Sequence, residues 1–272
     1  MTQTNSAPRV IITGAAGGIG SATVTALRAR GAQVVGLDVA ADDGIVACDV
    51  TDQASVDAAV IDAQERLRGI DVVINCAGIG DPQSAGERPG EDAVRVLDIN
   101  LMGTWRVTAA ALPAVRAAKG RVINVASGLA HLSVPFATAY TLSKRGVVAY
   151  SDLLRLEYGD EIDVTTIYPG YIRTAIHESS TDKGMSLEGA VPVEKVEDAA
   201  ASLVRAALDD DPPRDLATSR QGTLSYGLLR VAPRGLVDRL VRGGVRRGVK
   251  AGRYDKSEMA SDFVSRMRAA AR

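Results

Sequence analysis

Short apolar runs and longer helical patterns alternate along most of the chain. The runs are rich in β-branched residues, are of strand length, and occupy residues 9–13, 33–38, 44–48, 71–75, 121–126 and 163–168. Segments long enough for helices separate them. Because apolar strands joined by helices are typical of a parallel sheet covered on both sides, the pattern predicts an α/β fold with a doubly wound parallel sheet in three layers.

The length favours a single domain. At 272 residues the chain is ample for one large domain, and no linker rich in Pro, Gly or Ser divides it. We predict a domain over residues 1–218, followed by an extension over residues 219–272. With 46% apolar residues and a net charge of −1, the composition is that of an ordinary globular protein, so we expect no nucleic-acid partner.

The N-terminal segment is polar up to the first strand-length run, which argues against a signal peptide. No run of about 18 apolar residues is present that could span a bilayer, so a cytoplasmic protein is expected. Cys48 and Cys76 lie in apolar segments, as expected for buried reduced thiols. His131 and His177 have no paired ligand spacing, so we expect no metal site and interpret both as ordinary polar loop residues.

A glycine-rich turn, "TGAAGGIG", follows the first strand and opens a helix. Gly14, Gly18 and Gly20 would let the backbone turn tightly and approach a pyrophosphate at the positive end of that helix. The second strand ends in Asp38, at the distance expected for a carboxylate that binds a ribose. Together these features predict a Rossmann-type dinucleotide site rather than a merely structural turn.

Asp38 also indicates which dinucleotide is preferred. Its carboxylate would accept hydrogen bonds from the two ribose hydroxyls and would repel a 2′-phosphate. The segment "LDVAADDG" contains no arginine to offset that repulsion. The sequence therefore predicts NAD rather than NADP.

Two further strand ends fit the same ligand. Asp49 and Val50 follow the third strand, and "NCAG", with Asn75, Ala77 and Gly78, follows the fourth. Both could border the adenosine half of a dinucleotide. Asp49 could equally be an ordinary N-cap, and the small residues of "NCAG" could serve close packing alone.

The chemistry is concentrated after the fifth strand. Ser127 follows this strand, and Tyr140 and Lys144 lie four residues apart, which on a helix puts both side chains on one face. A phenol with a pKa near 10 is mostly protonated at neutral pH, but a nearby cation would stabilise its phenolate. Tyr140 and Lys144 are therefore candidates for proton transfer.

The motifs "TGAAGGIG", "NCAG", "DIN", "NVAS", "YTLSK" and "YPGYIRT" follow one another in the order and spacing of the classical short-chain dehydrogenase/reductase family, which the chain resembles over roughly residues 8–210. Cys76 stands where that family often has a second asparagine. The resemblance implies that Tyr140 is the general acid/base and that Lys144 holds the nicotinamide ribose and lowers the tyrosine pKa. It also implies that Ser127 orients the substrate oxygen and that Asn100 anchors a water that relays protons.

Each of these residues also has a plainer interpretation. Asn100 could cap or kink its helix, and Ser127 could be a turn residue. The resemblance further places Ile172 and Thr174 against the nicotinamide, in a segment that could instead be a proline turn. The predicted cofactor-binding residues are Gly14, Gly18, Ile19, Gly20, Asp38, Asp49, Val50, Asn75, Ala77, Gly78, Tyr140, Lys144, Pro169, Gly170, Ile172 and Thr174.

The extension over residues 219–272 is basic, with 13 Lys/Arg against 4 Asp/Glu, a net charge of +9. Since the whole chain carries −1, the remaining residues carry −10. Apolar residues recur in it at helical spacing: Leu224, Leu228, Val231, Leu236 and Leu240. We favour a lid or subunit contact whose apolar face covers the substrate pocket; an element facing an anionic membrane is the alternative.

The resemblance implies an enzyme that uses a nicotinamide cofactor to interconvert a secondary alcohol and a ketone, and we expect a homodimer or homotetramer. A hydrophobic or cyclic substrate is suggested by six apolar residues: Leu132, Val134, Pro135, Phe136, Ile176 and Met185. A non-catalytic dinucleotide sensor would not need the proton-transfer residues. A nucleotide-sugar epimerase or dehydratase would have a longer C-terminal substrate domain.

Overall fold

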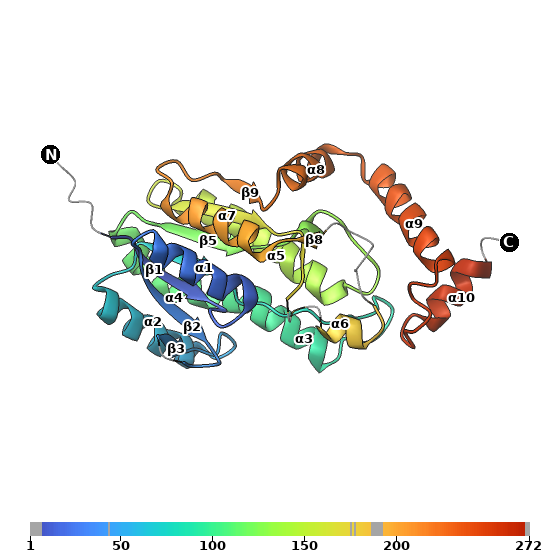
Figure 1. Cartoon of the computed structure of the whole chain (residues 1–272), viewed down its shortest axis with the longest axis horizontal. Helices are drawn as coiled ribbons and strands as arrows, with labels where there is room; N and C mark the ends of the chain where they lie inside the picture. The colour runs from blue at the N-terminus through green and yellow to red at the C-terminus, as the bar shows by residue number, and fades with distance from the viewer. Residues whose placement is uncertain (1–6, 43, 175, 177, 186–192, 270–272) are drawn as a thin grey trace.

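A computed structural model describes residues 7–42, 44–174, 176, 178–185 and 193–269 (Figure 1). Its strands are β1 (Arg9–Thr13), β2 (Gln33–Asp38), β3 (Ile45–Ala47), β4 (Val72–Asn75), β5 (Arg121–Val125), β6 (Asp163–Tyr168), β7 (Tyr171–Ile172), β8 (Val193–Glu194) and β9 (Asp215–Ala217). The central sheet has seven parallel strands in the order β3-β2-β1-β4-β5-β6-β9. Strands β2 and β3 are added on one side of β1, and β4 and the later strands on the other side. This makes the sheet doubly wound and confirms the predicted fold class.

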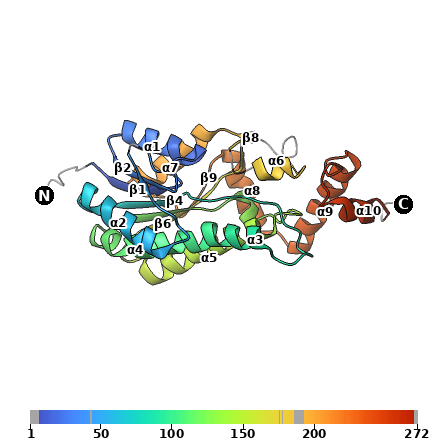
Figure 2. The same cartoon turned by 90° about the horizontal axis from the view of Figure 1, so that it is seen from below.

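Helices cover both faces of this sheet. They are α1 (Gly18–Ala29), α2 (Gln53–Leu67), α3 (Glu91–Leu97), α4 (Thr104–Ala117), α5 (Thr138–Tyr158), α6 (Glu178–Asp182), α7 (Val196–Leu208), α8 (Arg220–Val231), α9 (Arg234–Lys250) and α10 (Ser261–Ala269). Figure 2 shows α1 and α7 on one side of the sheet and α2, α4 and α5 on the other. Each side has its own apolar core, since the strands bury residues on both faces.

The six predicted strands are present, within a residue or two of their expected ends. The seventh strand of the sheet, β9, was not predicted. It has only three residues, and its pairing with β6 rather than its own apolar pattern fixes it in the sheet. A small second sheet pairs β7 with β8 beside the carboxyl end of the central sheet.

The helix around Asn100 is irregular. A π-helical segment (Asp98–Gly103) joins α3 to α4, so the backbone is wider there than in a regular α-helix. Short π-segments of this kind are frequent at functional sites. Thr104 donates a hydrogen bond from its hydroxyl to the Asn100 carbonyl at 2.9 Å, which satisfies one acceptor in this stretch.

The basic extension forms α8, α9 and α10, which lead away from the sheet to the end of the molecule opposite the N-terminus (Figure 1). Pro233 is the residue before α9, as expected for a helix start. In the described part of the chain, no helix has the length and apolarity needed to cross a membrane.

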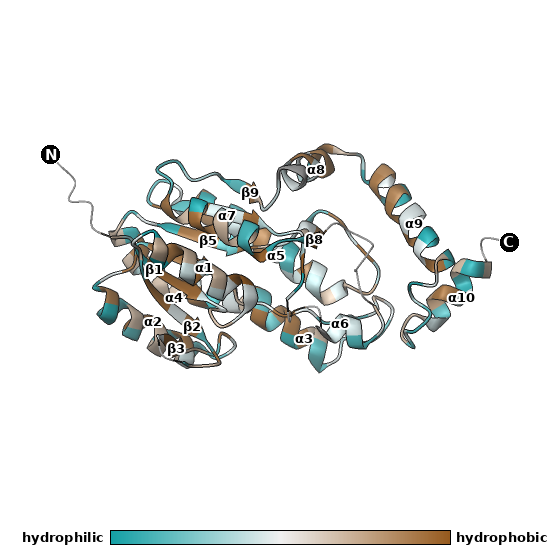
Figure 3. Ribbon diagram, in the orientation of Figure 1, coloured by the Kyte–Doolittle hydropathy of each residue, from teal (hydrophilic) through white to brown (hydrophobic). Residues whose placement is uncertain are grey.

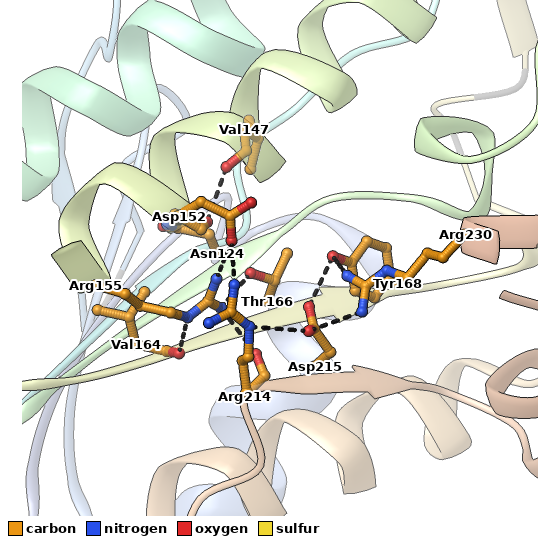
Figure 4. A network of polar contacts seen from close by, with 11 residues as sticks. Asn124, Val147, Asp152, Arg155, Val164, Thr166, Tyr168, Arg214, Asp215 and Arg230 are labelled. Atoms are coloured by element: carbon orange, nitrogen blue, oxygen red, sulfur yellow. Dashed lines mark hydrogen bonds and ion pairs between the residues drawn. The ribbon is translucent and has the colours of Figure 1, made fainter. Parts of the chain in front are cut away.

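The start of the extension is fastened to the sheet by a polar network (Figure 4). Arg230 of α8 donates hydrogen bonds to Asp215 and to the Tyr168 hydroxyl, each at 3.0 Å. Tyr168 in turn donates to Asp215 at 2.8 Å. The network continues through Arg214 and Arg155, which both donate to Asp152 of α5. Arg230 therefore ties α8 to the last two strands of the sheet.

The far end of the extension has a second attachment, which is aromatic. Phe136, in the loop before α5, stacks edge-on against Phe263 of α10, with ring centres 5.3 Å apart, and lies 6.1 Å from Tyr254. Val249 and Val264 are buried in the same cluster. Because both ends of the extension are attached, α9 has a defined orientation between them.

Candidate functional site

The glycine-rich turn after β1 is built from close backbone contacts. Gly14 has a φ of +69°, and a Cβ there would lie 2.9 Å from the backbone N and Cα of Ala77. A Cβ on Gly20 would lie 2.0 Å from the Gly14 carbonyl oxygen. Only glycine is compatible with either position. The first turn of α1 thus presents bare backbone N–H groups to the cavity, an arrangement that suits a phosphate.

Asp38 closes the other side of this turn. Its carboxylate accepts hydrogen bonds from the backbone N–H of Ala16 at 2.9 Å and of Ala40 at 3.2 Å. These contacts hold the partly exposed carboxylate at the edge of the cavity. No basic side chain of the described residues forms an ion pair with Asp38.

A cavity of about 1340 Å³ runs along the carboxyl ends of the strands. It is lined by all but one of the predicted cofactor-binding residues and by three of the four predicted catalytic residues: Gly14, Gly18, Ile19, Gly20, Asp38, Asp49, Val50, Ala77, Gly78, Ser127, Tyr140, Lys144, Pro169, Gly170, Ile172 and Thr174. The strand ends therefore gather these residues in one place, as the sheet topology requires.

Asn75, predicted to touch the cofactor, does not line this cavity. Its side chain is buried and donates hydrogen bonds to Thr108 and Asn124, both at 2.8 Å. Asn124 extends the chain to Ser151 of α5 at 2.9 Å. This places the Asn75 side chain in a polar bridge between β4, β5 and two helices rather than against a ligand.

Ser127, Tyr140 and Lys144 converge on the cavity. Ser127 accepts a hydrogen bond from the Leu129 backbone N–H at 3.2 Å, which fixes its side chain at the end of β5. Lys144 is buried, donates to the Val125 carbonyl at 2.9 Å, and lies 5.7 Å from the Tyr140 ring centre. The Tyr140 hydroxyl is within hydrogen-bond reach of Ser127.

Asn100 does not line the cavity but stands directly behind it. It is buried and pairs with the Ile79 backbone on both sides of its amide, at 2.8 and 3.0 Å. A Cβ on Gly78 would lie 3.3 Å from Asn100 Oδ1 and 3.4 Å from Lys144 Nζ. Gly78 thus leaves open the space toward which both side chains point.

The expectation that Lys144 lowers the pKa of Tyr140 is wrong for the ligand-free protein. Burial raises the pKa of Tyr140 above its usual value, and the hydrogen bond with Ser127 opposes this only in part. Burial also lowers the pKa of Lys144 to about 8. Lys144 donates its hydrogen bond to the Val125 carbonyl, and burial disfavours the charged forms of both Lys144 and Tyr140.

Burying Lys144 should cost stability, and the Lys144→Met variant should reveal this. Between pH 8 and 10.5 the unfolded state binds more protons than the folded state, so wild-type stability should rise with pH by up to about 3 kcal/mol. The ligand-free variant, lacking this group, should exceed the wild type in free energy of unfolding most at pH 7 and least near pH 10. Urea unfolding at several pH values measures the difference. If the difference in free energy of unfolding between variant and wild type did not change with pH, burial would not lower the pKa of Lys144 as described.

A second, smaller cavity of about 260 Å³ lies beside the first. It is lined by the six residues predicted to form an apolar substrate pocket: Leu132, Val134, Pro135, Phe136, Ile176 and Met185. Tyr140 lines both cavities. Val241 and Val245 of α9 cover part of the smaller one, so the extension contributes to the pocket.

The apolar residues predicted to cover the pocket do not do so. Leu224 and Leu228 of α8 are 73% and 68% exposed, and Leu240 of α9 is 66% exposed. The opposite face of α8, with Tyr226 and Leu229, lines the large cavity instead. Helical spacing identified the apolar face correctly, but which face turns inward is set by the attachments at Arg230 and Phe136.

Tyr226 and Glu194 are among the cavity-lining residues that were not predicted. Tyr226 lies over Gly128, close enough that a Cβ there would meet the tyrosine hydroxyl. Glu194 accepts hydrogen bonds from the Gly170 backbone N–H at 2.9 Å and from the hydroxyls of Thr218 and Ser219. Helical periodicity could have indicated Tyr226, which is on the face opposite the leucines. Neither a motif nor a periodic pattern in the sequence indicates a role for Glu194.

Among the described residues, His131 and Cys48 are buried and Cys76 is partly buried. His131 is buried rather than a polar loop residue on the surface, and its ring centre lies 4.8 Å from that of Tyr168. His177 lies outside the described residues. Burial raises the pKa of Cys48 and Cys76 to about 11, as for inert thiols. No His, Cys, Asp and Glu side chains of the described residues cluster as a metal site would.

The arrangement fits a nicotinamide dinucleotide. The bare glycine backbone would hold the pyrophosphate, Asp38 the adenosine ribose, and Lys144 the second ribose. Side chains on Gly14 or Gly20 would fill the space by which the backbone approaches the ligand. At the other end, the Pro169–Thr174 segment and Tyr140 border the place where a reacting ring and a substrate would meet.

Comparisons with known proteins agree with this geometry. Residues 8–184 match the family described as short chain dehydrogenase. The oxidoreductase UcpA of Escherichia coli is 36% identical over 186 residues, covering 62% of this chain and 71% of UcpA. Retinol dehydrogenase 16 of Homo sapiens is 38% identical over 185 residues, covering 61% of this chain and 57% of that protein.

Solved structures share the fold. A short chain dehydrogenase from Burkholderia cenocepacia, determined in complex with NADP, superposes with a TM-score of 0.71 at 24% sequence identity. The superposition covers 86% of this chain and 98% of the other.

Proposed function

Because this chain belongs to the short-chain dehydrogenase family and is an oxidoreductase with a nicotinamide dinucleotide cofactor, we propose that it interconverts a hydrophobic or cyclic secondary alcohol and its ketone. One observation carries the proposal. Tyr140 is on the wall shared by the large cavity, which fits the dinucleotide, and the small apolar cavity. A proton-transferring group must stand at the junction of cofactor and substrate.

The residues around Tyr140 have complementary roles in this proposal. Bound nicotinamide supplies a hydride acceptor for oxidation or a hydride donor for reduction. Ser127 donates a hydrogen bond that orients the substrate oxygen, and Tyr140 exchanges a proton with that oxygen. Lys144 is held by the Val125 carbonyl at 2.9 Å in reach of the Tyr140 ring, and Asn100 faces the space beside Lys144. These groups can relay the proton away from the tyrosine.

The raised pKa of Tyr140 keeps its hydroxyl protonated at neutral pH. A phenol that stays protonated is ready to donate to a ketone oxygen, whereas oxidation needs the ionised form. Oxidation should therefore gain more than reduction when the pH rises above 7.

The substrate class rests on the small cavity, whose walls are mostly apolar. Its volume of about 260 Å³ suits the body of a medium-sized apolar molecule with its carbinol at Tyr140. A relative, retinol dehydrogenase 16, is named for an apolar primary alcohol, which supports the apolar character of the substrate. Screening cyclic and acyclic secondary alcohols and ketones by nicotinamide absorbance tests the proposal. Turnover confined to small, strongly polar alcohols would contradict it.

We also propose a homodimer that forms through α4 and α5. Trp105 of α4 is 53% exposed and touches Tyr150 of α5, with ring centres 5.6 Å apart, while Leu153 and Leu156 of α5 are also exposed. This apolar surface joins two neighbouring helices on one side of the sheet (Figure 2). An isologous contact between two such faces would bury it.

Replacing Leu153 and Leu156 with Glu should convert the dimer to a monomer, because the isologous contact would bring like charges together. Analytical ultracentrifugation measures the change. Ile61→Glu on α2, at a similarly exposed position, is the control and should leave the dimer intact. A wild type that is monomeric at all concentrations, or a dimer unaffected by the double substitution, would refute this interface.

A further inference from the structure

The outer face of the extension is a continuous apolar surface. We define it as the side of α8 and α9 that carries the residues Leu224, Leu228, Val231, Leu236 and Leu240, which are 49–81% exposed. Figure 3 shows hydrophobic residues along α8 and the first half of α9, at the margin of the molecule. An apolar surface of this extent on a soluble domain usually marks a contact with another surface.

This outer face cannot turn inward to cover the catalytic cavities. Arg230 fastens α8 to Asp215 and Tyr168, and Phe136 fastens the far end through Phe263. The inner side of the extension is already used, since Tyr226 lines the large cavity and Val241, among others, lines the small one. The leucines therefore remain available to a partner outside the chain.

Basic side chains flank the same face. From Arg220 to Lys250 the chain has eight Lys/Arg and one acidic residue, Asp238. Arg239, Arg242 and Arg246 of α9 are exposed, and among the described residues none of them has a hydrogen-bond or ion-pair partner. Their charge is thus not neutralised by the protein itself.

The charge of this face distinguishes between two possible partners, a second copy of the chain and a lipid surface. In an isologous dimer, two copies of the outer face would meet and bring their uncompensated arginines together. An anionic lipid surface offers both complements at once: headgroups for the arginines and acyl chains for the leucines. We infer that α8 and the first half of α9 bind peripherally to membranes that contain anionic lipids. This inference concerns where the enzyme acts and does not depend on which alcohol it oxidises.

Co-sedimentation of the full-length protein with vesicles tests the inference. The vesicles contain phosphatidylcholine alone or phosphatidylcholine with phosphatidylserine, each at low and high salt. The wild type should pellet with the anionic vesicles at low salt, should be partly released at high salt because salt screens the arginines, and should bind the neutral vesicles weakly.

Two sets of variants separate the apolar from the electrostatic contribution. Leu228→Gln should weaken binding several-fold, whereas Ile61→Gln, at a 59% exposed position on α2, should not. Removing Arg239, Arg242 and Arg246 by substitution with Gln should weaken binding about a hundredfold, since each basic residue near an anionic surface contributes about 1 kcal/mol. The control, with Arg30, Arg68 and Lys119 changed to Gln, removes the same charge elsewhere and should retain most binding.

Activity on a water-soluble alcohol, measured without vesicles, should be the same in all these variants and shows that each is folded. Wild-type protein that does not pellet, or that pellets equally with neutral vesicles, would overturn the inference. So would self-association that Leu228→Gln abolishes, with no vesicle binding, because it would identify a second copy of the chain as the partner.

Discussion

Tyr140→Phe should reduce kcat by ~10²–10⁴-fold and leave the dissociation constant for the dinucleotide nearly unchanged. Only the hydroxyl is removed, and the ring that borders both cavities remains. Wild-type oxidation should rise with pH toward the raised pKa of Tyr140, because the base is the ionised phenol, and the residual activity of the variant should lack this rise. Steady-state kinetics across pH and a fluorescence titration with the cofactor measure the two quantities.

Tyr158→Phe provides the matched control. Tyr158 is on the same helix, α5, but lines neither cavity, so loss of its hydroxyl should leave kcat within a factor of about two. A Tyr140→Phe enzyme that retains more than about a tenth of wild-type kcat would exclude Tyr140 as the general acid/base.

The second large effect that we expect is on the preference for NADH over NADPH, which should depend on Asp38. We expect kcat/KM for NADH to exceed that for NADPH by about a hundredfold, because the Asp38 carboxylate would face a 2′-phosphate across a short distance. In Asp38→Asn the side chain can still accept the hydrogen bond from Ala16, 2.9 Å in the wild type, but its charge is lost. The ratio should therefore fall toward one in this variant.

Asp57→Ala on α2 removes an equal charge away from the cavity and should leave the cofactor ratio unchanged. A wild type that prefers NADPH would contradict the role assigned to Asp38. An Asp38→Asn enzyme with an unchanged ratio would do the same, because the discrimination would then have another source.

Much of the fold and the cavity lining could be predicted because they depend on local patterns. Apolar runs identified six of the seven strands of the central sheet. The order of the strand ends brings Gly14, Asp38, Ser127 and Tyr140 to one cavity. Such residues follow strands whose position in a parallel sheet is fixed by topology. The six apolar residues of the small cavity are close to these strand ends in sequence, and they were also identified.

Features that depend on distant contacts could not be predicted in the same way. Asn75 directly precedes residues that line the cavity, but its side chain donates hydrogen bonds to Thr108 and Asn124 instead. The pKa of Tyr140 depends on how deeply it is buried, and sequence spacing shows only that Lys144 is near. In the extension, helical spacing separates two faces of α8, but Arg230 and Phe136 determine which face turns outward.

Label transfer tests the central claim most directly. Cyclic secondary alcohols, each deuterated at the carbinol carbon, are incubated in turn with NAD and the wild-type protein. The reduced cofactor is then analysed by mass spectrometry. We predict one deuterium in the reduced nicotinamide for each ketone formed, with product formation lowered ~10²–10⁴-fold in Tyr140→Phe. Tight binding of the dinucleotide without labelled cofactor or ketone, for every alcohol tested, would contradict the account and indicate a dinucleotide sensor.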